Sequence, residues 1–415
     1  MIDAADAGDL LALLASIPDP RRTPGRVHPT GYVLAVVLVA FTSAAFAHLV
    51  GAAAWAAAAP QWVLRLLGGR PDPFTGRIHP PSEATIRRVV TGLDPTVLQP
   101  VLATWLTARL ARSDPDPDPA AEPGLTGLSV DGKTLRGTRD ASGCSSAMRH
   151  LLGAAGHDQV MLAQVAVDGK TSEIDSVPAV LEQLHAAGHL TARTVVTLDA
   201  LHTIRETAQA IRDRGAHYLM TVKGNTPTLA NAVIDRLRAT PADDLGHHTQ
   251  TAKGHGRTEH RLITTATLTE VGTVHTSDDA TDDAKVTFPD AAQVARIVRH
   301  RGDLSGQRTA KEIVHIITSL PSPLADPAAL ARLTLGHWSI EALHHIRDVT
   351  FGEDTHRART GHAPTVLAAI RNTITAAIRL AGHTNIAAAR RDATLDIRTA
   401  IAWFTHRTDP DILPL

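Results

Sequence analysis

The sequence has little of three residue classes, and each shortage excludes a kind of protein. Its 415 residues include one cysteine, Cys144, which excludes an internal disulfide and a Cys-rich zinc module. Aromatic residues make up 3% of the chain, so a broad stacking platform for single-stranded nucleic acid is not expected. A surplus of positive charge is also lacking, because 41 Lys and Arg oppose 42 Asp and Glu, and any nucleic-acid binding must depend on local patches. Hydrophobic residues make up 43%, enough for two or three folded domains of about 150 residues.

Residues 33–59 contain no Asp, Glu, Lys or Arg. They are long enough to span a membrane, but 12 of the 27 are alanine, which favours helix and is weakly hydrophobic. We expect a buried pair of helices in which Gly51 allows a break; a single membrane span is the alternative. The first residues, MIDAADAGDLLALL, lack the basic region of a secretory signal, which predicts a cytoplasmic protein without membrane association.

Helix signals dominate residues 1–112. Ser82 is placed to cap a helix that begins at Glu83, and Asp94-Pro95 opens another that runs to about Arg112. The stretch SDPDPDPAAEPG (113–124) has five Pro or Gly in twelve residues and predicts a linker.

After this linker the pattern changes to short apolar strands alternating with helices. Three strands joined by tight turns predict an antiparallel meander, and the strand–helix–strand steps that follow require parallel crossovers. The order of three strands, helix, strand, helix, strand is that of an RNase H-like mixed sheet, in the α/β class. The expected strands are 125–131, 148–157, 159–170, 194–200 and 217–224, and the expected helices are 173–187 and 203–214. Residues 243–320 predict a β-rich insertion, and the chain from about Pro327 to Phe404 reads as helical.

Three acids stand out in this arrangement. Asp131 is predicted to end the first strand and Asp199 the fourth, so that neighbouring parallel strands bring both carboxylates to one edge, and Glu341 lies on a helix after the insertion. Carboxylates within a few ångströms repel one another, and divalent metal relieves this repulsion. Two ions roughly 3.5–4 Å apart could clamp the oxygens of a phosphodiester, and oxygen ligands favour Mg²⁺ or Mn²⁺. Each acid alone has a simpler interpretation, as a turn or cap residue for the two Asp and as a solvated helix face for Glu341.

Five blocks of sequence resemble the DDE transposases of bacterial insertion sequences, in the H-repeat-associated branch. They are LSVDGKTLRG (128–137), VVTLDALHTIRETAQAI (195–211), HYLMTVKGNTPTL (217–229), GHGRTEHR (254–261) and HWSIEALHHIRDVTFGEDTHRARTGHAP (337–364). The N-terminal DPRR and PSEATIRRV are similar to that branch's associated helical domain. The resemblance implies an RNase H-like core interrupted by a β insertion, and Asp-Asp-Glu metal catalysis by Asp131, Asp199 and Glu341. If Glu341 fails as the last acid, Glu353 and Asp354 are the next candidates.

The expected organisation follows from pattern and resemblance together. We expect an all-helical N-terminal domain over 1–112 that binds DNA ends, and a linker over 113–124. The catalytic core would occupy 125–242, the β-rich insertion 243–320, and helices completing the core 321–415.

Basic and polar residues near these motifs are candidate DNA contacts. His337 stands where many relatives have an Arg, and Asp348 lies near their usual Lys, so His337 is either a phosphate donor or a packed structural His. Residues 296–311 carry a net charge of plus four, the clearest candidate DNA track. Trp338 could stack on a base, but core packing is the favoured interpretation. The candidate DNA contacts are Lys133, Arg136, Lys223, Asn225, Arg257, Arg296, Arg299, Arg301, His337, Arg357 and Arg359.

The function expected from this is transposition of an insertion sequence. The enzyme would cleave the 3′ ends of its element and join them to target DNA, with two Mg²⁺ or Mn²⁺ ions and as a homodimer assembled on double-stranded DNA. The alternatives are an RNase H-like nuclease or resolvase without strand transfer, and a former transposase that binds DNA without cutting it.

Overall fold

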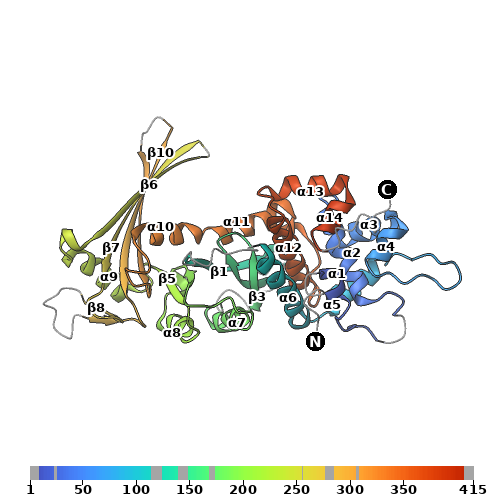
Figure 1. Cartoon of the computed structure of the whole chain (residues 1–415), viewed down its shortest axis with the longest axis horizontal. Coiled ribbons are helices and arrows are strands. Elements are labelled where there is room, and N and C mark those ends of the chain that lie inside the picture. The colour runs from blue at the N-terminus through green and yellow to red at the C-terminus, as the bar shows by residue number, and fades with distance from the viewer. Residues whose placement is uncertain are drawn as a thin grey trace.

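A nine-stranded mixed sheet runs through the middle and one end of an elongated molecule, and helices fill the other end (Figure 1). The computed structural model describes residues 9–22, 26–113, 124–138, 148–167, 173–254, 256–275, 285–304 and 308–405. The strand order is β3-β2-β1-β4-β5-β11-β10-β7-β6, with β8 and β9 forming a separate pair. The strands are β1 (Thr126–Leu135), β2 (Arg149–Gly156), β3 (Met161–Val167), β4 (Thr194–Leu198), β5 (His217–Val222), β6 (Gly246–Gly254), β7 (Arg257–Thr267), β8 (Thr273–His275), β9 (Lys285–Thr287), β10 (Gln293–Asp303) and β11 (Arg308–Thr318).

The first five strands confirm the predicted order. β1, β2 and β3 form an antiparallel meander, whereas β4 pairs parallel to both β1 and β5. The predicted helices between them are α7 (Glu173–Ala186) and α8 (Arg205–Asp213). Each of these helices connects two parallel strands, as the crossover rule requires.

The predicted insertion is rich in strands, and it extends the same sheet. β11 pairs antiparallel with β5, and β10, β7 and β6 add in turn beyond it. Helix α9 (Pro227–Ala239), which begins with Pro at its first position, was not predicted. Neither were the short strands β8 and β9 or strand β6, most of whose residues are exposed. A strand without a buried face has no apolar alternation to reveal it.

The two faces of the sheet are covered by different helices. α7, α8 and α9 pack on the face that carries Leu128, Val130, Met220 and Val294. α10 (Pro327–Gly336) packs on the other face, against Ile263 and Ile297 among others, and α11 (Ser339–His345) follows it. Apolar side chains on both faces explain why the central strands read as continuous hydrophobic runs.

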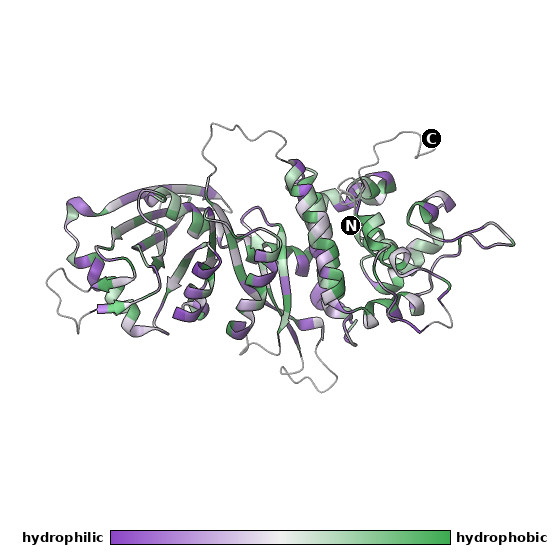
Figure 2. Ribbon diagram, turned by 60° about the horizontal axis from the view of Figure 1, so that its bottom comes forward, coloured by the Kyte–Doolittle hydropathy of each residue, from purple (hydrophilic) through white to green (hydrophobic). Residues whose placement is uncertain are grey.

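Helices from both ends of the chain share one hydrophobic core at the other end of the molecule. Figure 2 shows hydrophobic residues gathered in these helices, near the marks of the two termini. Because α6 and α2 contact α12 directly, neither set of helices forms this core alone. The helices are α1 (Leu10–Leu14), α2 (Thr30–Thr42), α3 (Leu49–Ala58), α4 (Gln61–Leu66), α5 (Glu83–Gly92), α6 (Pro95–Ser113), α12 (Ala363–Leu380), α13 (Ile386–Leu395) and α14 (Ile397–Ala402).

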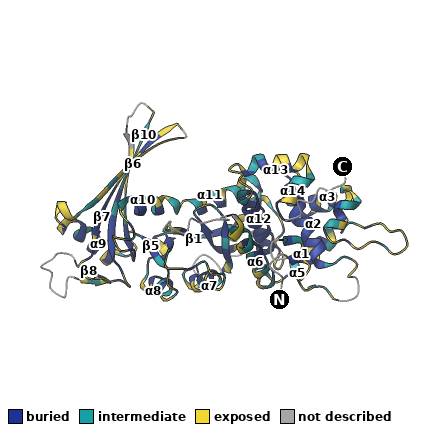
Figure 3. Ribbon diagram, viewed as in Figure 1, coloured by how far each residue is buried: buried dark blue, intermediate teal, exposed yellow. Residues whose placement is uncertain are grey.

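The charge-free stretch 33–59 forms α2 and α3, as a helix pair. All of α2 is buried, whereas α3 is partly exposed (Figure 3). The chain leaves the helix after Thr42 and resumes at Leu49, so the break does not lie at Gly51, whose N–H donates to His48 Nδ1 at 2.8 Å inside the first turn of α3. Within the part of the chain that the structure describes, no helix is both long and apolar enough to cross a membrane.

The predicted helix starts near Ser82 and Asp94 are confirmed. The Ser82 hydroxyl accepts a hydrogen bond from the N–H of Thr85 at 3.3 Å, which caps α5, and α6 begins at Pro95. The predicted linker lies almost wholly outside the described residues, which stop at Ser113 and resume at Gly124.

Candidate active site

Two of the three candidate acids lie side by side where the parallel pairing of β1 with β4 ends. Val130 of β1 is opposite Leu198 of β4, and Asp131 and Asp199 occupy the next position on each strand. The expectation that Asp131 ends its strand is wrong, because β1 stays paired with β2 as far as Leu135. Asp131 therefore sits where the parallel neighbour stops and the antiparallel neighbour continues, which fixes its backbone from one side.

The third acid comes from helix α11 on the same face of the sheet. Ile340 and Leu343 pack against Ala155 and Met161, which seats α11 over β2 and β3. Glu341 lies between these two apolar residues in sequence and is exposed. The helix thus turns its apolar side to the sheet and leaves Glu341 free to interact with the carboxylates on the strands.

The charges of the three acids act on one another. Burial raises the pKa of Asp131 to about 6, and the neighbouring charges of Asp199 and Glu341 add to this shift. The partial burial of Glu341 also raises its pKa, with the charge of Asp199 as the second cause. The carboxylates are close enough to repel, which is the electrostatic condition that a bound cation relieves.

By its chemistry this donor set fits a divalent cation, but it is not closed into a finished cage. Among the described residues, no group of three or more His, Cys, Asp or Glu side chains is arranged as a ready metal site. One Asp199 oxygen is occupied, since it accepts the N–H of Leu201 at 3.0 Å and caps the short helix η5 (Ala200–His202). The simpler interpretation of Asp199 as a cap residue is thus also realised.

Two histidines of the α10–α11 segment approach the acids. His344 Nδ1 lies 3.5 Å from Asp131 Oδ2, and burial, followed by Arg347 and Lys133, holds its pKa well below the usual range. His337 Nδ1 lies 3.0 Å from the Thr197 hydroxyl on β4, and burial lowers its pKa as well. Both rings are therefore neutral near pH 7, and of the two interpretations offered for His337 this geometry matches the packed structural residue. His344 was missed because only its position three residues after Glu341 could have indicated it.

A buried histidine–glutamate cluster, which no sequence pattern indicated, lies under Asp131 on the opposite face of the sheet. Glu173 is 2.7 Å from His150 Nε2 and 3.6 Å from His202 Nε2, and all three residues are buried. Hydrogen bonds from His150 and His202 outweigh burial and lower the pKa of Glu173 to about 2. Gly132 leaves room for this cluster, because a Cβ there would lie 2.6 Å from the Glu173 carboxyl.

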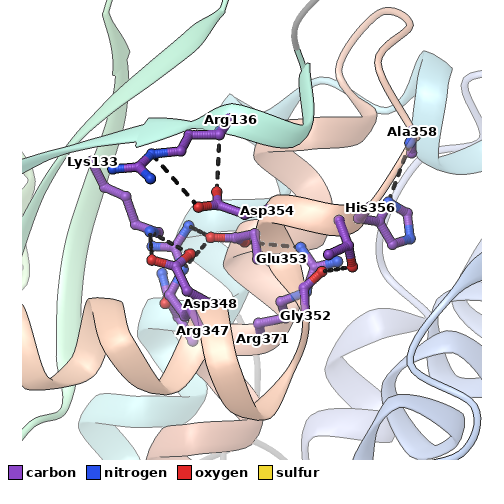
Figure 4. A network of polar contacts seen from close by, with 12 residues as sticks. Lys133, Arg136, Arg347, Asp348, Gly352, Glu353, Asp354, His356, Ala358 and Arg371 are labelled. Atoms are coloured by element: carbon purple, nitrogen blue, oxygen red, sulfur yellow. Dashed lines mark hydrogen bonds and ion pairs between the residues drawn. The ribbon is translucent and has the colours of Figure 1, made fainter.

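Lys133 joins the strand of Asp131 to the segment that follows Glu341 (Figure 4). Its Nζ lies 2.6 and 2.7 Å from the two carboxylate oxygens of Asp348, in the π-helix η8 (Ile346–Thr350), and its side chain is 6% exposed. Lys133 was predicted to contact phosphate, but here its ammonium is buried in this ion pair. Arg136 also contacts an acid of this segment: its backbone N–H donates to Asp354 Oδ1 at 3.1 Å. Its side chain, however, is 77% exposed.

A buried triad of charged residues links the short helices after Glu341 to helix α12 (Figure 4). The Glu353 carboxylate, in η9 (Glu353–Thr355), is 2.7 Å from Arg347 and 2.9 Å from Arg371 of α12. Burial raises the pKa of Glu353, but the two guanidinium groups outweigh burial and the net pKa is lowered. Glu353 was an alternative third acid, and its carboxylate is fully engaged in this structural triad.

Four more of the predicted DNA contacts lie in loops. Lys223 is exposed just after β5, and Asn225 donates to the Ala200 carbonyl at 2.7 Å, which ties its loop to η5. Arg357 is exposed, and exposed Arg359 donates to the Gly137 carbonyl at 3.0 Å.

Strand β10 separates the residues of the predicted DNA track. Side chains alternate between the faces of a strand, so Arg296 points to one face and Arg299 and Arg301 to the other. The three arginines therefore do not share one face of the strand. The Arg299 guanidinium lies 5.8 Å from the ring centre of Trp338, and Trp338 is 46% exposed, so the favoured interpretation of that Trp as a core residue is also wrong. Arg257 is exposed and lies 3.1 Å from Glu259.

Two family models match the chain. The model described as "Transposase DDE domain" matches residues 122–376, which include all three candidate acids. The model described as "DDE_Tnp_1-associated" matches residues 11–106, in the N-terminal helices.

Several curated proteins are similar over most of the chain. "Putative transposase YncI" of Escherichia coli O157:H7 is 26% identical over 294 residues, which cover 70% of this chain and 69% of that protein. "H repeat-associated putative transposase YhhI" of Escherichia coli (strain K12) is 26% identical over 299 residues, 70% of this chain and 71% of that protein. "Uncharacterized protein in dhlA 3'region" of Xanthobacter autotrophicus is 31% identical over 260 residues, 60% of this chain and 77% of that protein.

Proposed function

The chain belongs to the transposase DDE domain family, and from this premise we propose that it is the DNA transposase of an insertion sequence, cleaving 3′ ends and transferring them to target DNA. The observation that carries the proposal is the placement of Asp131 and Asp199 side by side, just beyond the last parallel pair of β1 and β4, with Glu341 above them on α11. The raised pKa of Asp131, caused by burial and then by the other two acids, supports their acting as one site.

The catalytic core is proposed to be RNase H-like. In support, the order is β3-β2-β1-β4-β5, and β2 alone runs antiparallel to the other four strands. The β insertion enters after α9 and returns through β11, before the helix of the last acid.

Asp131, Asp199 and Glu341 are the residues that would hold Mg²⁺ or Mn²⁺, in two ions. When bound, the metal would activate water and stabilise charge on the leaving 3′ oxygen. Asp131 is oriented by its strand and by neutral His344, whose Nδ1 lies 3.5 Å away, while Lys133 and Asp348 fix the distance between β1 and the segment after Glu341. Lys223 and Arg357 are exposed and would contact DNA phosphates.

The proposal has three further elements. The N-terminal helices bind the element ends, two copies of the protein assemble on double-stranded DNA, and the protein acts in the cytoplasm. The second candidate function is a nuclease or resolvase with the same acids and no strand transfer. It shares every feature of the acid site, so strand transfer itself must be the test.

The experiment uses the full chain and a duplex that carries the sequences flanking its gene. With Mg²⁺ or Mn²⁺ we expect a nick that leaves a 3′-OH at the element boundary, followed by covalent joining of that end to a supercoiled plasmid. Chelator should stop both steps, and Ca²⁺ should permit binding without cleavage, because its looser coordination misplaces the oxygens. Cleavage without joining would favour the nuclease, and binding without cleavage in any metal would contradict both candidates.

A further inference from the structure

The four strands β6, β7, β10 and β11 form a blade that projects from the end of the sheet (Figure 1). The pairing of β10 with β7 is regular over eleven residue pairs, and that of β7 with β6 over nine. Alternate residues of each strand therefore belong to one face or the other without ambiguity.

One face of the blade lies on the same side of the sheet as the acids. Ala295 and Ile297 of β10 pack with α10 on this side, and Arg299 reaches Trp338, three residues before Glu341. We call this the catalytic-side face. It carries all three carboxylates of the four strands, Glu259, Asp303 and Glu312.

The arginines of the catalytic-side face are paired with those carboxylates. Arg257 lies 3.1 Å from Glu259, and Arg299 lies 3.0 Å from Glu312. Arg261 is also paired with Glu259, and Arg301 approaches both Glu259 and Glu312 at 3.9 and 3.6 Å. Much of the positive charge on this face is therefore neutralised within the protein.

The opposite face, which we call the back face, has a different composition. At the described positions of the four strands it holds seven basic or histidine side chains and no acid. These are His247, Lys253, His260, Arg296, His300, Lys311 and His315. Within the described residues, Lys253, Arg296 and Lys311 are in no ion pair, and Lys253 and Lys311 are exposed. Figure 3 shows that the projecting ends of β6 and β10 lack the burial of the central strands.

The back face is also ordered in rows across the strands. Arg296 and His315 lie in one row, and His300 and Lys311 in another, four residues farther along β10. Such a separation is about 14 Å along a strand. Between the two rows lie the exposed apolar side chains Leu262 and Ile313, which are 38% and 48% exposed. Helix α9 covers the base of this face, and its Asp235 is paired there with Arg238.

We propose that the back face of the blade binds a second DNA duplex, distinct from the duplex that enters the acid site on the other side of the sheet. Cations that are in no ion pair, on strands whose side chains on this face include no acid, are complementary to phosphate, and two rows about 14 Å apart can contact separate phosphates of one duplex. The sheet itself lies between the two duplexes, so one subunit would hold two DNA segments. This inference rests on the proposed function, because it assumes that DNA also enters at the acids.

The test compares two variants of the full chain that each lose three positive charges. The back-face variant is Lys253→Gln with Arg296→Gln and Lys311→Gln. The matched control on the catalytic-side face is Arg257→Gln with Arg299→Gln and Arg301→Gln. The protein is bound in Ca²⁺ to a first labelled duplex that is fixed to a surface. A second labelled duplex is then added, and the amount captured by the bound protein is measured at increasing salt concentrations.

We expect the back-face variant to bind the first duplex as the wild type does and to lose capture of the second by tenfold or more. The salt slope of capture should fall by up to about 3, at about 0.9 for each phosphate that the variant no longer neutralises. The control should weaken binding of the first duplex instead. Unaltered capture in the back-face variant would overturn the inference.

Two other outcomes separate this inference from its premise. A wild-type protein that binds no duplex at all would contradict the proposed function, whereas one that binds a single duplex and never captures a second would contradict only the inference. A back-face variant whose mass in solution differs from that of the wild type would assign this face to contact between copies, and would also overturn it.

Discussion

Asp131 combines a partly buried carboxylate with two acidic neighbours, and this has a measurable effect on folding. Its pKa is raised from 3.8 to about 6 by burial first and then by the charges of Asp199 and Glu341. A carboxyl whose pKa is higher in the folded state stabilises the fold when protonated. That contribution is complete below about pH 4 and is lost as the pH rises through 6.

We therefore predict that Asp131→Asn stabilises the metal-free protein at pH 8 by about 1–2 kcal/mol and has little effect at pH 4. Urea unfolding in chelator at the two pH values measures this, with Asp243→Asn, an exposed residue of η6 (Ala242–Asp244), as the control. A substitution that destabilises the protein equally at both pH values would show that Asp131 is a structural residue.

Trp105 and Trp338 differ in burial, and their substitutions should differ accordingly. Trp105 is fully buried in the core of the helical end, whereas Trp338 is 46% exposed beside Arg299. Trp105→Ala should lower the free energy of unfolding by about 3–5 kcal/mol, since it leaves a cavity. Trp338→Ala should lower it by only about 1 kcal/mol, the value of a partly exposed cation–π contact. Equal losses in denaturant unfolding would contradict the exposed placement of Trp338.

At the scale of elements, one ion pair ties the strand of Asp131 to the segment after Glu341. Lys133 is two residues beyond Asp131, and Asp348 is seven residues beyond Glu341, so their contact at 2.6 Å limits how far the two catalytic elements can separate. A displacement of about 1 Å at an active site can reduce a rate about 100-fold.

We predict that Lys133→Gln and Asp348→Asn each reduce single-turnover cleavage by tenfold or more without weakening DNA binding to the same degree. The charge-exchanged double variant, Lys133→Asp with Asp348→Lys, should recover part of the rate. If the cleavage rate of the double variant is reduced by the product of the two single-variant factors, the pair does not act as a positioning contact.

The triad of Arg347, Glu353 and Arg371 holds η8 and η9 on α12, and its effect should be on stability. Glu353→Gln removes the only carboxylate of the triad and leaves two buried guanidinium groups without a counter-charge, which we expect to lower the free energy of unfolding by about 3–5 kcal/mol. Asp354→Asn is the matched control on the adjacent, more exposed residue and should change it by less than about 1 kcal/mol. A stable Glu353→Gln protein that cannot cleave DNA would instead make Glu353 a catalytic acid.

At the scale of the whole molecule, the features that could be predicted from the sequence are those that local patterns of residues encode. The apolar runs of β4 and β5 and the helices between parallel strands were enough to place Asp131 and Asp199 together. The attachment of the insertion could not be predicted in this way. It depends on antiparallel pairing of Leu219–Val222 with His315–Thr318, almost a hundred residues later in the chain, and no local period reports such a pairing.

The candidate site shows the same limit. The resemblance pointed to the three acids, but it did not indicate the ion-pair partners of Lys133 and Glu353. Asp348 lies 215 residues after Lys133, and Arg371 lies 18 residues after Glu353. The common core of α2, α6 and α12 likewise depends on contacts between the two ends of the chain. The cluster of positive charge in the sequence did not indicate a surface patch, because residues such as Arg296 and Arg299 are three positions apart in sequence but lie on opposite faces of the sheet.

The measurement that tests the central proposal most directly is cleavage of an element end by Glu341→Gln in Mg²⁺, beside binding of the same DNA. The substitution keeps the shape of an exposed side chain on α11 and removes one charge from the proposed metal site. We predict a folded protein that binds the end as the wild type does and nicks it about 10³-fold more slowly or not at all, with Asp131→Asn and Asp199→Asn equally impaired and double variants hardly worse. A Glu341→Gln enzyme that nicks the end at close to the wild-type rate would contradict the proposed triad.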